Sequence, residues 1–315
     1  MITDLQAQQE ESHSHHNNMA SPPEALILVT GGSGFIAAWC IIELVQRGYR
    51  VRTTVRSLKR TDEVRQMLKN GGLTEEQAQQ VDFAPVDLLK DDGWAEACTD
   101  CKFMLHVASP FPPNKPKHED EVVKPAKEGT LRALVAAKEA GIQRVVVTSS
   151  VAAIAYGHKE TNKTFTEEDW SIIDDTIEND PYQKSKTLAE RAAWDWAKEN
   201  PEVEVTTVCP ALVLGPVLGS DFSTSIQLVQ RMLNGQVPGL PQLSLGVVDV
   251  RDVADLHIRA MTDPKAKGER FMALSDDGFV SMKKMSLALK ERLGDKAKKS
   301  PTMEVPNFVL SIVAL

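Results

Sequence analysis

The fold is decided by residues 25–37, which read ALILVTGGSGFIA. The run from Ala25 to Thr30 is nearly continuously apolar, as expected for a strand that is buried on both faces of a parallel sheet. Glycines follow at once, and a helical pattern then runs from Phe35 to Arg47 and closes at Gly48. This order of strand, glycine turn and helix is typical of the first unit of a dinucleotide-binding fold.

The small residues of the turn each have a stereochemical use. Gly31 can take the backbone dihedrals of a tight turn, and Gly34 lets the main chain approach a pyrophosphate. Ala37 is small enough for the helix to pack closely on the strand. The backbone N–H groups at the helix start, at Phe35 and Ile36, would hold the anion together with the helix dipole. The alternative is a turn that needs glycines only for its shape.

Short apolar strands alternate with helical patterns after this unit. The alternation predicts right-handed βαβ units, and therefore an α/β fold with a doubly wound parallel sheet of Rossmann type. Beyond Gly215 the alternation becomes irregular, which suggests a smaller C-terminal lobe over the carboxyl edge of the sheet. The expected strands cover 50–55, 81–84, 103–107, 144–148 and 204–209, and the expected helices cover 62–69, 119–140 and 182–200.

The chain divides unevenly. Residues 1–24 are polar with almost nothing to bury, and we expect a disordered tail. Residues 25–215 form the expected dinucleotide-binding Rossmann domain, to which a strand and a helix at about 247–274 return. Residues 216–246 and 275–315 form the expected substrate lobe.

Charge and apolar content exclude several classes of protein. Lys and Arg number 36 against 44 Asp and Glu, a net charge of −8, which argues against binding nucleic acid or an anionic membrane. The sequence has no apolar run of about 18 residues and no secretory signal. Four cysteines in 315 residues do not make a disulfide scaffold. We therefore expect a soluble, cytoplasmic protein.

No metal site is expected. Cys98 and Cys101 have a metal-like spacing, but zinc needs about four ligands and no second pair of cysteines is near. His13, His15 and His16 lie in the polar tail, which lacks the fixed geometry that a metal needs.

The end of the second strand predicts which dinucleotide binds. An NAD site places an acidic residue about 20 residues after the glycine turn, where it accepts the ribose 2′-hydroxyl. Here residues 55–60 read VRSLKR, with no acid until Asp62. A guanidinium can bind a 2′-phosphate through two hydrogen bonds, whereas a carboxylate would repel it. The sequence therefore predicts NADPH, with a solvated basic turn as the alternative.

Three side chains are candidates for catalysis. Tyr182 and Lys186 are four positions apart, which puts both on one face of a helix. The Lys186 ammonium would favour the phenolate of Tyr182 and could hold ribose hydroxyls. Ser150 follows an expected strand, where its hydroxyl could donate to a carbonyl oxygen as negative charge develops, or merely satisfy backbone groups. His106 also ends a strand, and a core histidine is favoured there over a general base.

Together these motifs resemble the extended short-chain dehydrogenase/reductase superfamily, in its dihydroflavonol reductase-like branch. That branch includes cinnamoyl-CoA reductases, microbial NADPH-dependent aldehyde and ketone reductases and the methylglyoxal reductase type. The resemblance rests on the glycine turn, Thr148-Ser149-Ser150, Tyr182-x-x-x-Lys186, and the segments HVASP at 106–110, SKTLAERAAW at 185–194 and PALVLGP at 210–216.

The resemblance implies a role for each matching residue. Ser150, Tyr182 and Lys186 would be the catalytic set, and the last two would also contact the cofactor. The remaining cofactor contacts would come from the glycine turn, Arg56 and Arg60 at the 2′-phosphate, Asp87 and Leu88 beside the adenine, Ala108 and Ser109 at the fourth strand, Pro210 and Val213 at the nicotinamide, and Ser225 nearby.

Two departures from the plant members favour a simpler carbonyl substrate. Plant flavonoid reductases have Asn five residues after the catalytic serine, where this chain has Ala155. The cinnamoyl-CoA reductase segment NWYCYGK is replaced by NDPYQKSK at 179–186. Members of the branch also continue beyond the apolar stretch 308–315, so either the lobe is truncated or it closes differently.

We therefore expect an NADPH-dependent reductase of a small or medium aldehyde or ketone, a monomer or homodimer, with Tyr182 as the proton donor. Two alternatives stay open. One is an epimerase or dehydratase of nucleotide sugars that holds NAD tightly, and the other is a non-enzymatic dinucleotide sensor.

Overall fold

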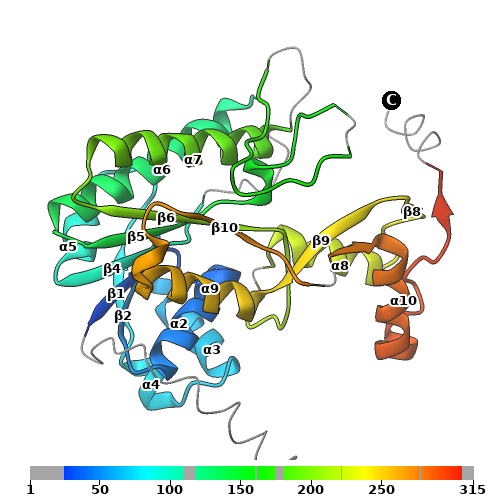
Figure 1. The fold of residues 1–315 in the computed structure, drawn as a ribbon. Helices are drawn as coiled ribbons and strands as arrows, with labels where there is room; N and C mark the ends of the chain where they lie inside the picture. The colour runs from blue at the N-terminus through cyan, green and yellow to red at the C-terminus, as the bar shows by residue number, and fades with distance from the viewer. Residues whose placement is uncertain are drawn as a thin grey trace, which may run out of the picture.

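Seven strands form a sheet at the centre of the molecule (Figure 1). The structure, a computed structural model, describes residues 25–109, 118–159, 162–174, 180–220, 222–276 and 278–306. The strands of the sheet are β1 (Leu26–Val29), β2 (Arg50–Val55), β3 (Asp82–Pro85), β4 (Cys101–His106), β5 (Arg144–Thr148), β6 (Glu204–Pro210) and β10 (Arg270–Ala273). Their order is β10-β6-β5-β4-β1-β2-β3, and all neighbours are parallel, which confirms the predicted doubly wound sheet.

The strand order reverses beside β1, which has β2 on one side and β4 on the other. In open α/β sheets, ligands bind at such a reversal, in the crevice outside the carboxyl ends of the strands. The glycine turn, residues 31–34, leaves the carboxyl end of β1 and leads into α2 (Phe35–Gln46). The fold therefore places the turn at this crevice.

Helices cover both faces of the sheet (Figure 1). One face carries α2, α3 (Thr61–Asn70), α4 (Glu75–Gln79) and α9 (Val250–Thr262), and the other carries α5 (Trp94–Cys98), α6 (Asp120–Glu139) and α7 (Pro181–Glu199). Ile27 and Val29 of β1 belong to the core that includes α2 and α9, whereas Leu26 and Leu28 belong to the core that includes α6. Burial on both faces explains why the β1 sequence is apolar without alternation.

A smaller unit with its own core lies at one side of the main sheet (Figure 1). It is built from β7 (Leu212–Leu214), α8 (Thr224–Leu233), β8 (Leu240–Pro241), β9 (Ser244–Asp249), β11 (Phe279–Ser281), α10 (Met282–Leu293) and β12 (Glu304–Val305). Strands β11, β9 and β7 form a three-stranded sheet, and β12 pairs with β8. Because β7 begins two residues after β6 ends, this unit starts at the carboxyl edge of the main sheet, as the sequence predicts.

The chain returns to the main sheet after β9. Helix α9 packs against α2, and β10 pairs with β6 at the edge of the sheet. The division into domains stays a prediction, and the expected tail, with its three histidines, lies outside the described residues. Among the helices that the structure describes, none is both long and apolar enough to cross a membrane.

Candidate active site

The glycine turn is held against the second strand. The Gly31 N–H donates to Thr54 Oγ1 at 2.9 Å, and the Gly32 N–H donates to the Thr54 carbonyl oxygen at 2.9 Å. Gly31 has φ 75°, which confirms the predicted need for glycine there. Gly32 carries no positive φ, but a Cβ on it would lie 2.4 Å from Thr53 Oγ1. The sequence alone gives no role to Gly32, because the residue that a Gly32 side chain would clash with, Thr53, lies on the neighbouring strand β2 and not in the turn.

The start of α2 fits a phosphate group. Its N-cap, Gly34, offers no side-chain oxygen to the first N–H groups of the helix, and no acidic residue lies in the first turn. The N–H groups of Phe35 and Ile36 therefore stand at the positive end of a helix of 12 residues. A dinucleotide phosphate supplies what the helix start lacks, an acceptor with negative charge.

Two arginines lie beside this turn. Arg56 follows β2 directly and is exposed. Arg60 donates from its guanidinium to Ser33 Oγ at 3.0 Å, and so is fixed against the glycine turn itself. Glu63 accepts two further hydrogen bonds from Arg60 at 2.9 Å, and this contact lowers the pKa of the Glu63 carboxyl. The structure therefore places Arg60 against the glycine turn, and the contact of both arginines with a 2′-phosphate stays a prediction.

The ends of β3 and β4 carry the other predicted contacts on this side. Ala108 donates its N–H to Thr30 Oγ1 at 3.0 Å, and a Cβ on Gly31 would lie 3.0 Å from the Ala108 Cβ. The structure thus brings Ala108 against the glycine turn. Asp87 and Leu88 follow β3, and Ser109 is exposed after β4.

The predicted contacts after β6 are more dispersed. Pro210 is buried at the last position of β6. Val213 is 6% exposed in β7 and packs into the core that includes α2 and α9. Ser225 is half-buried in the first turn of α8. The part of these three residues in cofactor binding stays a prediction.

Tyr182 and Ser150 are brought together by the fold. Asp180 caps α7 by accepting the Tyr182 N–H at 2.8 Å, so the helix begins with Tyr182 in its first turn. Ser150 follows the carboxyl end of β5, where its Oγ accepts the Ala152 N–H at 3.1 Å. The Ser150 side chain lies close enough to the Tyr182 phenol to lower its pKa.

Burial sets the protonation of Tyr182. Burial raises the pKa of the Tyr182 phenol above its ordinary value, and the hydrogen bond from Ser150 opposes this rise. The phenol is therefore neutral near pH 7 and able to give a proton. The Tyr-x-x-x-Lys spacing predicts that Lys186 favours the phenolate and so lowers the Tyr182 pKa. In the structure the Tyr182 pKa is raised instead, because desolvation by burial is the largest effect.

Lys186 lies one helical turn after Tyr182. Its Nζ donates to the Thr148 carbonyl oxygen at 3.4 Å, which ties the side chain to the end of β5. Burial lowers the pKa of Lys186 to about 8, against the opposing influence of Cys209 and Glu190. His106 is buried beside it with its Nδ1 3.1 Å from Thr30 Oγ1.

His106 is a neutral core residue in this structure. Burial, with a smaller effect from Lys186, lowers its pKa to about 3. This agrees with the sequence analysis, which favours a core histidine over a general base. The two cysteines with metal-like spacing are also buried, and the described residues hold no cluster of His, Cys, Asp or Glu that could bind a metal ion.

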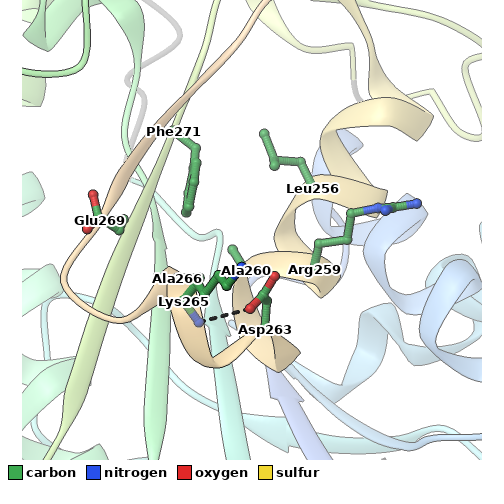
Figure 2. A pocket seen from close by; sticks show the side chains of 8 residues that line it. All are labelled: Leu256, Arg259, Ala260, Asp263, Lys265, Ala266, Glu269 and Phe271. Carbon is green, nitrogen blue, oxygen red and sulfur yellow. Dashed lines mark hydrogen bonds between the residues drawn. The ribbon is translucent and has the colours of Figure 1, made fainter. Parts of the chain in front are cut away.

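A separate pocket of about 260 Å³ lies between α9 and β10 (Figure 2). None of the predicted site residues lines it. Its walls are Leu256, Arg259, Ala260, Asp263, Lys265, Ala266, Glu269 and Phe271.

Comparisons with known proteins place the chain among relatives. Residues 27–273 match the NAD dependent epimerase/dehydratase family. The chain belongs to this family. It is 36% identical to cinnamoyl-CoA reductase CAD2 of Medicago truncatula over 247 residues, covering 77% of this chain and 74% of the relative. It is 30% identical to dihydroflavonol 4-reductase of Zea mays over 272 residues, covering 84% and 74%.

Solved structures agree with these sequence relatives. The yeast methylglyoxal/isovaleraldehyde reductase Gre2 complexed with NADPH matches with a TM-score of 0.76 and 26% identity, covering 92% of this chain and 93% of that one. Gre2 of Candida albicans in complex with NADPH matches with a TM-score of 0.74 and 30% identity, covering 92% and 88%. The predicted superfamily branch is confirmed, and the chain is an oxidoreductase of this family.

Proposed function

We propose that this protein is an NADPH-dependent reductase that converts the carbonyl group of a small or medium aldehyde or ketone into an alcohol, with Tyr182 as the proton donor. The observation that carries the proposal is the position of Ser150 beside the Tyr182 phenol, whose pKa it lowers, at the carboxyl edge of the sheet and one helical turn from Lys186. It supports the proposal because two neighbouring hydroxyl groups could both donate hydrogen bonds to one carbonyl oxygen.

The cofactor assignment is supported by the glycine turn, the uncapped start of α2 and two arginines. Arg60 is bonded to Ser33 of the turn and Arg56 is exposed beside it, so the site offers cations for a 2′-phosphate. Two structural relatives were solved with NADPH. When bound, NADPH supplies the hydride that is transferred to the carbonyl carbon.

The side chains of the protein supply the proton and stabilise charge. Ser150 and Tyr182 donate hydrogen bonds to the carbonyl oxygen and polarise it. As the carbon gains the hydride, the Tyr182 proton moves to the oxygen, which leaves an alcohol and a phenolate. The Lys186 ammonium, fixed by the Thr148 carbonyl, stabilises the phenolate until solvent returns the proton.

The proposed substrate class follows from what the site lacks. Ala155 has only a methyl group at the position where plant flavonoid reductases carry Asn, so it offers no hydrogen bond to a polyphenol. The relatives include a cinnamoyl-CoA reductase, a dihydroflavonol 4-reductase and a methylglyoxal/isovaleraldehyde reductase, which all act on carbonyl compounds. A simple aldehyde or ketone requires the fewest contacts beyond Ser150 and Tyr182.

The test is a panel of aldehydes and ketones with NADPH and with NADH, followed by cofactor absorbance. We expect consumption of NADPH, preferred over NADH. Tyr182→Phe should lower kcat by about 10²- to 10⁴-fold, because it removes a general acid, and should leave NADPH affinity largely intact. Tyr49→Phe, at a partly buried tyrosine in the loop before β2, is the matched control. Near-normal turnover by Tyr182→Phe would refute the role.

The two alternatives give different results in the same assay. An epimerase or dehydratase would convert a nucleotide sugar without net consumption of cofactor. A sensor would bind the dinucleotide and turn over no carbonyl compound. Either outcome would refute the proposed function.

A further inference from the structure

Glu190 is a charged residue in the interior of the protein. It lies on α7, one helical turn after Lys186 and two after Tyr182, and its side chain is 0% exposed. Burial of a carboxylate costs several kcal/mol unless charged and polar partners surround it, so a fully buried one calls for a reason.

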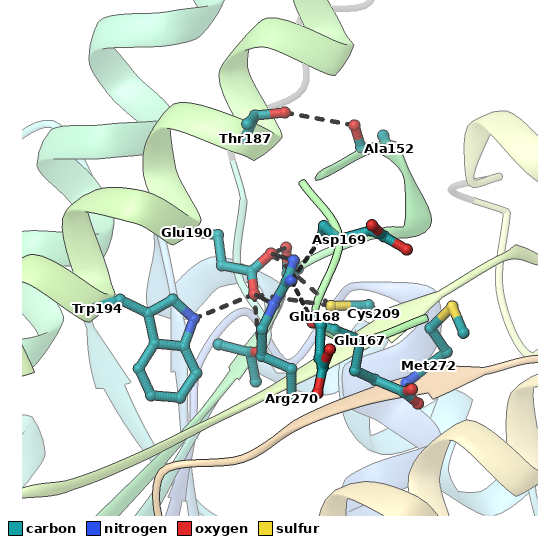
Figure 3. Close-up of polar contacts among 12 residues, drawn as sticks. Ala152, Glu167, Glu168, Asp169, Thr187, Glu190, Trp194, Cys209, Arg270 and Met272 are labelled. Carbon is teal, nitrogen blue, oxygen red and sulfur yellow. Dashed lines mark hydrogen bonds and ion pairs between the residues drawn. The ribbon is translucent and has the colours of Figure 1, made fainter. Parts of the chain in front are cut away.

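The partners of Glu190 come from four elements (Figure 3). Oε1 accepts hydrogen bonds from Arg270 Nε at 2.8 Å, Thr207 Oγ1 at 2.8 Å and Trp194 Nε1 at 3.2 Å. Oε2 accepts from Ser149 Oγ at 2.5 Å. One carboxylate therefore joins α7 to β5, β6 and β10.

Arg270 is held independently of Glu190. Its Nη1 donates to the carbonyl oxygens of Glu167 at 2.6 Å and Asp169 at 2.7 Å. Its guanidinium also lies 3.8 Å from the centre of the Trp170 ring. The positive charge of Arg270 would therefore stay in place if the Glu190 carboxylate were neutralised.

Glu190 and Lys186 also line the same small cavity. The cavity measures about 10 Å³, which is room for about one water molecule, and Ser149 and His106 line it as well. Ser149 follows Thr148, whose carbonyl oxygen accepts from Lys186 Nζ. Glu190 and Lys186 are therefore linked through the successive residues Ser149 and Thr148, and both side chains line one cavity.

We propose that Glu190 is a positioning residue: its carboxylate, bound by Arg270, holds the Lys186 ammonium and the carboxyl end of β5 in place for proton transfer. The proposal rests on the proposed function, since it concerns the same catalytic set. It differs from a purely structural role because it assigns the charge of Glu190, and not only its hydrogen bonds, to the protonation of Lys186.

The charged and titratable groups around Lys186 determine in which direction its pKa should change when Glu190 is neutralised. From β4, His106 is neutral because burial lowers its pKa to about 3. From β6, Cys209 is a neutral thiol because burial raises its pKa to about 12. On α7 itself, Tyr182 is neutral because burial raises its pKa, and Glu190 forms an ion pair with Arg270. Arg270 from β10 adds a positive charge behind Glu190, and the residues of α6 that line the cavity, Ala126 and Thr130, do not titrate.

Neutralising Glu190 should therefore lower the pKa of Lys186. In Glu190→Gln the attraction to the ammonium is lost and the repulsion from Arg270 remains. The alkaline limb of kcat/KM against pH reports the free enzyme, in which Lys186 loses its proton at about 8 and Tyr182 only at higher pH. We expect this limb to move by about one pH unit to lower pH, which lowers kcat/KM at pH 7 about twofold, because about half of Lys186 would then have lost its proton.

Two further variants separate the effect of the Glu190 charge from the effect of its shape and hydrogen bonds. Glu204→Gln neutralises another carboxylate that pairs with a buried arginine, at the amino end of β6, and should leave the alkaline limb where it is. Glu190→Asp keeps the charge on a shorter side chain, and we expect it to keep the limb near its original pH and to lower kcat. A Glu190→Gln variant whose limb and kcat/KM match the unmodified enzyme would overturn the proposal.

The outcomes also separate this inference from the proposed function. If the unmodified protein reduces no carbonyl compound with NADPH, the proposed function fails. If it does and Glu190→Gln behaves like it, only the inference fails. If Glu190→Gln does not fold, Glu190→Asp decides: a reduced kcat with an unmoved limb supports the proposal, and an unchanged kcat overturns it.

Discussion

Gly32 offers a test of how the glycine turn is positioned, through the variant Gly32→Ala. The added Cβ would lie 2.4 Å from Thr53 Oγ1 and 2.8 Å from Thr53 Cγ2, closer than real Cβ atoms approach. Thr53 cannot easily move, because it is fully buried and its Oγ1 donates to the Val29 carbonyl oxygen at 2.7 Å. Either Thr53 gives up this hydrogen bond or the turn moves away from β2.

The magnitude follows from these two contacts. Overpacking of a buried site costs about 1–3 kcal/mol, and loss of a buried hydrogen bond costs about 1 kcal/mol more. We therefore expect Gly32→Ala to lower the free energy of unfolding by about 2–4 kcal/mol. Because the turn carries the N–H groups that we expect to bind the phosphates, the affinity for NADPH should fall as well. Urea denaturation measures the first effect, and fluorescence titration with NADPH measures the second.

A second variant makes the reasoning refutable. Thr53→Ala removes the two nearest of the three Thr53 atoms that the new Cβ would meet and leaves Thr53 Cβ at 3.1 Å, so it should relieve most of the clash in the double variant Gly32→Ala/Thr53→Ala. The double variant should be more stable than the sum of the single effects predicts, by about 1 kcal/mol or more. Simple additivity of the two unfolding free energies would show that the clash with Thr53 does not determine the need for glycine.

Three other predictions follow from the described contacts. Arg56→Asp should lower the preference for NADPH over NADH by roughly 10- to 100-fold, because a hydrogen bond to a charged group contributes about 1.5–3 kcal/mol. An unchanged ratio of the kcat/KM values for the two cofactors would contradict the assignment. Burial lowers the pKa of His106 to about 3 and of His257 to about 4, so the unfolded chain takes up protons first as the pH falls. The free energy of unfolding present above pH about 6.5 should then decrease toward pH 4 by up to about 1.4 kcal/mol per pH unit for each histidine. Urea denaturation at several pH values should show that this free energy depends less steeply on pH in His257→Gln than in the unmodified protein. Arg144→Met should lower the free energy of unfolding by about 3–5 kcal/mol, because the buried guanidinium pairs with Glu204 at 2.7 Å, and an equal melting temperature would contradict this.

The parts of the site that could be predicted from the sequence are those fixed by local stereochemistry. The turn at Gly31 needs a positive φ, and a glycine directly after an apolar strand indicates that need. Tyr182 and Lys186 share a helix face because four residues make about one turn. Ser150 joins them because parallel strands end at one edge of the sheet, which a βαβ pattern already implies.

The parts that could not be predicted depend on neighbours that the strand order supplies. A glutamate at position 190, between apolar positions of an amphipathic helix, ordinarily faces solvent. Its burial depends on Ser149, Thr207 and Arg270, which come from three adjacent strands. The pKa of Tyr182 is a similar case, since the nearby lysine predicts a lower value and burial against distant residues raises it.

The edge strand β10 connects these observations. An exposed edge strand offers unpaired N–H groups to other chains, and proteins commonly cover such edges. Here the Met272 N–H donates to a Glu167 side-chain oxygen at 3.1 Å, and the Glu167 carbonyl oxygen accepts from Arg270. The segment that covers the edge therefore also fixes the cation that binds Glu190. Because β10 is added beside β6 only after the chain has formed most of the smaller unit, the cation that pairs with Glu190 comes from the part of the main sheet that is completed last along the sequence.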